Sequence, residues 1–135
     1  MKTVLRIVVI IFAMTVLITT AIEAREVVQP GPVVSLGQFT SNLAGTGHHV
    51  IACEISLELI AKDKAIELLQ TPGWIARVRH EIFAFLRGKN YNEFTGAEGT
   101  MQLAKDIRKL LNEILPDVEG ESPIVNVWFE SIILQ

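Results

Sequence analysis

An uncharged apolar run near the N-terminus constrains this chain more than any other feature. It covers residues 7–22 as IVVIIFAMTVLITTAI, with Lys2 and Arg6 before it and Glu23 and Arg25 after it. A segment of this kind either enters a membrane or is removed at one. Because positive charge is retained on the cytoplasmic side, we expect the short basic N-terminus in the cytoplasm and everything after the run outside it.

Two interpretations of the run compete. A signal peptide would be cleaved after the small residues Thr19-Thr20-Ala21 and would release a free periplasmic binding module. A retained transmembrane anchor would occupy residues 7–24, since a helix of the uncharged run spans about 24 Å of a hydrocarbon core about 30 Å thick. In that case residues 1–6 are cytoplasmic, residues 25–33 form a short tether, and residues 34–135 form the exported domain.

Charge and cysteine content limit the classes of protein to which the exported part can belong. The chain has 12 basic and 15 acidic residues, and leaving out Lys2, Arg6 and Glu23 gives 10 and 14, a net charge of −4. This balance disfavours nucleic acid as a partner, because no basic patch is available to neutralise phosphates. With Cys53 as its one cysteine, the domain has no internal disulfide and depends on its core, which suits a bacterial envelope protein.

Three segments have the pattern of β-strands. Residues 34–43 form the first, in which Gly37 indicates a bulge, and a Gly-Thr-Gly turn follows. Residues 49–59 alternate strictly between apolar and polar side chains, the pattern of a long, half-buried antiparallel strand. Residues 124–134 are rich in β-branched and aromatic residues and form the last strand.

The middle of the chain has helical periodicity. A short helix with Asp63 as its cap extends to Leu69, and a second begins with Thr71 as N-cap and continues to about Arg87. After a single turn at residues 90–94, a capping box of Thr95 and Glu98 starts a further helix that ends at Pro116. Its expected apolar stripe consists of Met101, Ala104, Ile107, Leu111 and Ile114.

These elements predict an α+β domain of order β-β-α-α-β, with helices on one face of an antiparallel sheet. A three-stranded sheet has two edges, and an edge strand is a natural place for a neighbouring subunit to join.

The residues give no support to an enzyme, a cofactor or a metal site. His48 and His49 would point to opposite faces of a strand, and His80 falls in a helix far from both in sequence. Cys53 lies within the apolar alternation and is expected to be a buried, inert thiol. Trp74 and Trp128 are the candidate interaction residues, because aromatic side chains dominate interface energetics.

Five segments occur in a recognisable order. They are Leu36–Leu43 (LGQFTSNL), the Gly-His-His-Val turn leading into Glu54–Leu59 (EISLEL), Tyr91–Gly99 (YNEFTGAEG), Leu111–Leu115 (LNEIL) and the terminal Val125–Gln135 (VNVWFESIILQ). Together they resemble the family of the flagellar basal body-associated protein FliL. The ordered series covers about residues 34–135, and the N-terminal apolar run fits the topology of the family.

The resemblance implies a single-pass protein of the bacterial inner membrane, with a periplasmic domain similar to stomatin-type (SPFH) domains. It implies association with flagellar stator units at the basal body, support of flagellar rotation and of swimming or swarming motility, a ring of homo-oligomeric domains, and no catalysis. It favours the retained anchor over the cleaved signal. The tether of this chain is short compared with many members, which would hold the domain near the membrane surface.

Overall fold

The computed structural model describes residues 31–135. The predicted cytoplasmic residues 1–6, the anchor over residues 7–24 and most of the tether over residues 25–33 lie outside the described part. Within residues 31–135, no helix is long and apolar enough to span a bilayer.

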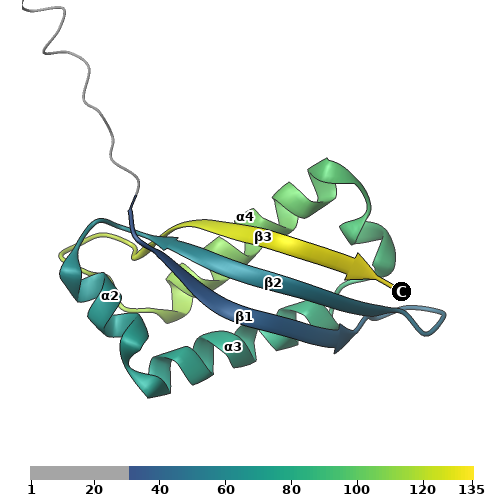
Figure 1. Cartoon of the computed structure of the whole chain (residues 1–135), viewed down its shortest axis with the longest axis horizontal. Helices are drawn as coiled ribbons and strands as arrows, with labels where there is room; N and C mark the ends of the chain where they lie inside the picture. The colour runs from purple at the N-terminus through teal and green to yellow at the C-terminus, as the bar shows by residue number, and fades with distance from the viewer. Residues whose placement is uncertain (1–30) are drawn as a thin grey trace, which may run out of the picture.

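The described residues form an α+β domain in which two strands precede a block of helices in the sequence and a third strand follows it (Figure 1). The elements are β1 (Val33–Asn42), β2 (Val50–Leu59), α2 (Asp63–Gln70), α3 (Pro72–Arg87), the 3-10 turn η1 (Tyr91–Phe94), α4 (Gly96–Ile114) and β3 (Ile124–Leu134). The predicted class and the β-β-α-α-β order are confirmed, with the short helix α2 preceding the two long helices.

The sheet is antiparallel with strand order β1-β2-β3, so that β2 is central and both β1 and β3 are edges. In register, Cys53 of β2 lies between Phe39 of β1 and Ile132 of β3. The predicted alternation of β2 is confirmed, because one set of its side chains is fully buried. This set is Ile51, Cys53, Ile55, Leu57 and Leu59.

A β-bulge in β1 lies where Gly37 indicated one. The pairing with β2 shifts between Ser35 and Gly37, and Gly37 has a φ of 79°, which a residue without Cβ adopts at little cost. The extra residue lets Leu36 and Phe39, three positions apart, both face the core, whereas a regular strand would turn them to opposite faces.

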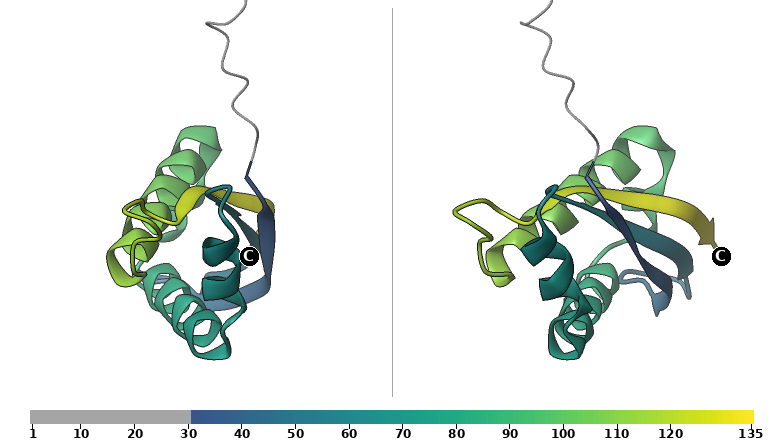
Figure 2. Two further views of the ribbon diagram at one scale, coloured as in Figure 1. Left: turned by 90° about the vertical axis from the view of Figure 1, so that its left-hand side faces the viewer. Right: turned by 60° about the vertical axis from the view of Figure 1, so that its left-hand side comes forward.

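All helices lie on one side of the sheet, with α3 toward β1 and α4 toward β3 (Figure 2). The buried side chains fill the space between the helices and the inner face of the sheet. Since no described element covers the outer face, the domain has two layers, as is common for antiparallel sheets.

The apolar stripe of α4 agrees with the expected one at Ile107 and Leu111 but not at Met101. Its buried residues are Leu103, Ile107 and Leu111, whereas Met101 is 60% exposed. The residues from 101 to 114 have two overlapping apolar series, and the prediction chose the one beginning at Met101. Leu103, Ile107 and Leu111 are spaced by four, and Leu103 has a larger apolar side chain than Ala104, so packing against the sheet buries this series most deeply.

The helix caps also differ from expectation. Asp63 is the first residue of α2, with Lys62 as its N-cap, so the prediction for Asp63 was wrong. Thr95 is the N-cap of α4 but donates its hydroxyl to the carbonyl of Asn92 (2.8 Å) instead of capping the helix. The reach-back bond of a capping box occurs five residues earlier, where the backbone N–H of Asn90 donates to Glu93 Oε2 (2.7 Å).

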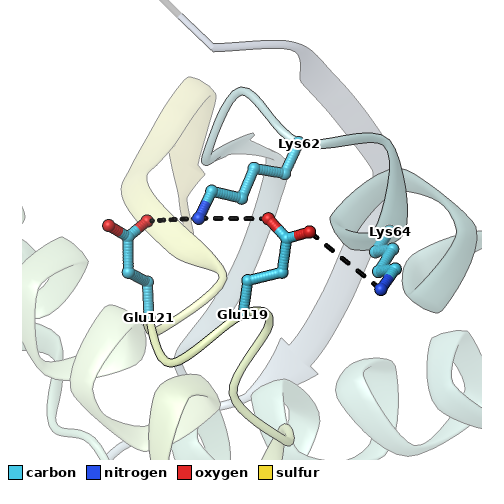
Figure 3. Close-up of polar contacts among 4 residues, drawn as sticks. All are labelled: Lys62, Lys64, Glu119 and Glu121. Carbon is cyan, nitrogen blue, oxygen red and sulfur yellow. Dashed lines mark ion pairs between the residues drawn. The ribbon is translucent and has the colours of Figure 1, made fainter.

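Ion pairs join the loop before β3 to the start of α2 (Figure 3). Lys62 Nζ lies 3.2 Å from Glu119 Oε2 and 3.4 Å from Glu121 Oε2. The hydrogen bond that Lys62 donates to Glu119 is the main cause that raises the pKa of Lys62, and Glu121 adds to it. Glu119 and Gly120 both have positive φ in the tight turn from Val118 to Glu121, so these contacts hold a turn that reverses the chain into β3.

Candidate interaction surface

A groove of about 280 Å³ separates α4 from the edge strand β3. Its lining residues are Thr100, Met101, Ala104, Lys105, Arg108, Asn126, Val127, Trp128 and Phe129. We call this surface the β3–α4 groove. Two of its large apolar side chains are strongly exposed, Met101 at 60% and Trp128 at 48%.

Helix α4 supplies one wall through its periodicity. Thr100, Ala104 and Arg108 are spaced by four and lie one position along from the buried stripe of the same helix. Consequently the burial of that stripe fixes the direction in which the groove wall points. The small side chain of Ala104 leaves the space between the long side chains of Met101 and Arg108.

Hydrogen bonds from α4 fix the beginning of β3. The side chain of Asn112 donates to the carbonyl of Ile124 (2.9 Å) and accepts from its N–H (3.0 Å). Arg108 Nη1 donates to the carbonyl of Val125 (3.2 Å). These contacts occupy edge groups of β3 at its first two residues, at the end of the groove.

Two irregularities shape β3 beyond this point. The pairing with β2 shifts between Ile124 and Asn126 and again between Phe129 and Ser131. The second shift leaves Glu130 unpaired in the ladder, and its carboxylate accepts a hydrogen bond from Ser56 Oγ (2.8 Å). In register with Ser56, Trp128 lies between the two irregularities and is directed away from the core.

The chemistry of the groove favours binding of an apolar segment. Met101 offers a flexible, polarisable side chain and Trp128 offers an aromatic one, and both types of side chain are effective at interfaces. Lys105 and Arg108 are exposed and add positive charge along the α4 wall. A partner with apolar side chains and one or more carboxylates would match both features.

The structure does not bring the two predicted interaction residues together. Trp74 lies in the first turn of α3, is half-buried against the core, and lines a separate shallow pocket with Thr71, Gly73 and Arg77. The guanidinium of Arg77 lies 5.6 Å from the centre of its ring. Trp74 is therefore partly used in packing, whereas Trp128 is available at the surface.

The histidines and the cysteine occupy separate environments. Within residues 31–135, no three His, Cys, Asp or Glu side chains are grouped as metal ligands would be. His49 stacks on Tyr91, with ring centres 4.4 Å apart, and its Nδ1 lies 3.2 Å from the carbonyl oxygen of Gln135. Cys53 is 1% exposed, and burial raises the pKa of its thiol from 9.0 to about 11, which makes it a poor nucleophile at neutral pH.

The roles of two residues at the edges of the sheet, Met101 and Arg79, were not predicted from the sequence. Met101 was assigned to the core, although its place two residues before Leu103 offered a clue that it belongs to a different side of the helix. Arg79 was not singled out, yet it caps the other edge of the sheet by donating to the carbonyls of Leu36 and Gln38 in β1. No local pattern marks that role, because the two partners lie about 40 residues away from it.

Comparison with known proteins gives one informative match. The model of the family described as flagellar basal body-associated protein FliL matches residues 33–135, which includes every described strand and helix. No curated protein matches the chain.

Proposed function

The chain belongs to the family of the flagellar basal body-associated protein FliL, and on this basis we propose that it is a non-enzymatic accessory protein that binds the stator units of the flagellar motor. Membership implies a role at the flagellar basal body. The observation that supports a binding role is the β3–α4 groove, with exposed Met101 and Trp128 beside Lys105 and Arg108.

We propose that residues 7–24 are a retained anchor in the inner membrane. Residues 1–6 would then lie in the cytoplasm, and the tether over residues 25–33 would hold the domain over residues 34–135 at the periplasmic surface. The length and apolar character of residues 7–22 support the retained anchor. A tether of about nine residues spans at most about 30 Å, which would keep the domain near the membrane surface. We also propose that the fold is related to stomatin-type (SPFH) domains.

The proposed mechanism depends on binding and not on chemistry. Domains confined to one membrane plane meet at a high effective concentration, so weak contacts suffice for a homo-oligomeric ring. A ring that binds the active stator more tightly than the inactive one increases the active population, whereas equal binding to both would change nothing. Support of flagellar rotation, swimming and swarming follows from that shift.

Deletion and complementation test the proposal. Deletion of the gene should reduce swimming, swarming or motor torque, and the wild-type gene should restore it. A Met101→Ser, Trp128→Ser variant should be made in normal amounts yet fail to restore motility. Val33→Ser is the matched control, because Val33 is an exposed apolar residue of the opposite edge. Unchanged swimming, swarming and torque after deletion would refute the proposal.

Fractionation tests the anchor separately. The full chain should stay with the membranes during extraction at alkaline pH, and its N-terminal sequence should begin at the start of the chain. Release into the soluble fraction with a new N-terminus after Ala21 would instead identify a cleaved periplasmic module.

A further inference from the structure

We propose that copies of this chain associate head to tail, with the exposed basic ridge of α3 in one copy against the acidic outer face of β2 and β3 in the next. The inference rests on the proposed function, because it takes self-association from there and assigns the surfaces that carry it. It uses the outer face of the sheet, whereas the groove contact uses the α4 side of β3; the two share Trp128, which is in register with Ser56 between Glu54 and Glu58.

The ridge of α3 is defined by Arg77, His80, Ala84 and Arg87, which recur at helical spacing and are all exposed. They lie opposite the buried stripe of the same helix. The ion pairs among residues 31–135 involve Lys62, Lys64 and Lys89, so both arginines of the ridge are without a carboxylate partner in the described part of the chain. The small side chain of Ala84 permits close approach.

The outer face of the sheet has the opposite charge. Register and alternation place Glu54, Glu58 and Glu130 on this face together with the exposed Ile133. Glu58 accepts a hydrogen bond from Asn126, and Glu130 accepts one from Ser56, so two of the three carboxylates are held in place. No described Lys or Arg in β1, β2 or β3 neutralises them, because these strands contain none.

The spacing of the charges matches. Arg77 and Arg87 are ten residues apart on a helix, which separates them by about 15 Å along the axis. Glu54 and Glu58 are four residues apart on a strand, which separates them by about 13 Å. A helix laid along the outer face can therefore bring each arginine near a carboxylate, in the geometry of complementary charged interfaces.

The position of the two surfaces fits a ring. In Figures 1 and 2, α3 and β3 lie on opposite sides of the domain, and the chain enters at one end of the sheet. The entry point is fixed because the N–H of Leu59 donates to the carbonyl of Pro32 (2.9 Å). With that end toward the membrane, both surfaces face sideways. Contact between two different surfaces repeats from copy to copy and closes when the rotation permits.

Cross-linking of the full chain in membranes tests the contact. Ala84→Cys and Ser131→Cys place thiols at the centres of the two surfaces, and Ser131 is paired in register with Glu54. A chain carrying both should form dimers and higher multimers with a bifunctional maleimide. Each single variant should form few, because like surfaces do not meet. The parent chain is the control, since Cys53 is buried.

Charge reversal sharpens the test in the two-cysteine chain. Glu54→Lys or Arg87→Glu alone should lower the cross-linked yield about tenfold, since like charges would then face one another. Both reversals in one chain should restore most of the yield, because every contact again joins opposite charges. Glu113→Lys and Lys109→Glu, at exposed positions of α4, are matched controls that should leave the yield unchanged.

The outcomes separate this inference from the proposed function. Protection of Cys53 from alkylation would verify that each variant is folded. Strong cross-linking of a single-cysteine chain, no cross-linking of the two-cysteine chain, or no effect of charge reversal would each overturn the head-to-tail contact. If motility still falls on deletion, the motor role stands without it. If cross-linking succeeds while deletion leaves motility unchanged, the contact stands and the motor role fails.

Discussion

At β1 the middle of the sheet edge is covered by Arg79 of α3, whereas at β3 the edge beyond its first two residues lies beside a groove. The guanidinium of Arg79 donates to two carbonyls of β1 and lies 4.4 Å from the centre of the Phe39 ring. A parallel bridge between Ala44 and Asn90 covers the chain just after β1. On β3, side chains of α4 occupy only the first two residues, and Trp128 stays exposed.

The difference between the two edges suggests that β1 contributes mainly to folding stability and β3 mainly to partner binding. An exposed edge strand has unpaired backbone N–H and C=O groups that can pair with another chain, and proteins usually cover or distort such edges. Arg79 covers the β1 edge near its bulge, where Leu36 and Phe39 are buried, whereas Met101 and Trp128 are exposed beside the β3 edge. Changes along β1 should therefore affect folding, and changes along β3 should affect partners.

Replacement of Phe39 should have the largest effect on folding. Its side chain is fully buried and packs against Phe83, with ring centres 4.9 Å apart. Phe39→Ala should lower the free energy of unfolding by about 3–5 kcal/mol, because it removes contacts and leaves a cavity. Urea denaturation of the full chain in mild detergent, followed by circular dichroism, measures this loss.

The matched change on the β3 side is Ile133→Ala. Ile133 is 54% exposed, so we expect a change of about 0.5 kcal/mol or less. Equal losses for the two variants would contradict the division between the edges.

The arginines give the next largest contrast. Arg79→Met keeps an unbranched apolar side chain but removes the donors to Leu36 and Gln38. The free energy of unfolding should fall by about 1.5–3 kcal/mol, since carbonyls in a partly buried bulge lose a charged donor. Arg108→Met, which removes one bond to Val125 at the exposed edge, should cost about 0.5 kcal/mol or less in the same titration. A larger loss for Arg108→Met would reverse the comparison.

The thiol of Cys53 lies in the central strand β2, between the two edges, and its ionisation couples folding stability to pH. Burial raises the pKa of this thiol from 9.0 to about 11. Between these values the unfolded chain has lost a proton that the folded chain retains, so stability falls as the pH rises. The contribution of Cys53 should be a loss of about 2 kcal/mol by pH 11, and Cys53→Ala should remove this part of the pH dependence.

The thiol also distinguishes the edges kinetically. Alkylation of Cys53 at neutral pH should be faster in Arg79→Met than in wild type. Local opening of β1 would expose the neighbouring strand β2, which carries the Cys53 thiol. Ile133→Ala should leave the rate unchanged. The same rate in all three proteins would show that the β1 edge does not protect the central strand.

Replacement of Trp128 should have a small effect on folding and a clear effect on partner binding. Trp128→Ser should change the free energy of unfolding by about 1 kcal/mol or less, because the side chain is 48% exposed on an edge strand. Co-purification of the proposed stator partner from membranes should nevertheless fall strongly. Retained co-purification would remove Trp128 from the proposed contact.

Much of the fold could be predicted from local patterns. The alternation along residues 49–59 has a period of two, and the run over residues 124–134 has β-branched and aromatic residues, so both strands were found within one residue of their bounds. Thr71-Pro72 and Pro116 limit helices through backbone geometry that depends on proline alone. Such signals depend on residues that are close in the sequence, so they can be recognised without knowledge of tertiary contacts.

The candidate surface was less predictable. Trp128 was singled out by its residue type, but the groove also needs Met101, which lies on α4 and was assigned to the wrong face. The choice between two overlapping apolar series in α4 depends on which side meets the sheet. Thr95 and Glu98 had the spacing of a capping box, but the hydroxyl of Thr95 bonds to Asn92 instead. Short-range competition of this kind is not visible in spacing alone.

Sequence patterns were enough to predict the α+β class, the order of the elements, the buried face of β2 and membership of the FliL family. These follow from periodicity, from proline and glycine, and from the ordered segments of a family. The contact of Arg79 with the β1 edge came from tertiary packing instead, because Arg79 and its partners are more than 40 residues apart in the chain. It also decided that α4 leaves a groove beside β3, because the packing of one helix stripe against the sheet directs the adjacent stripe outward.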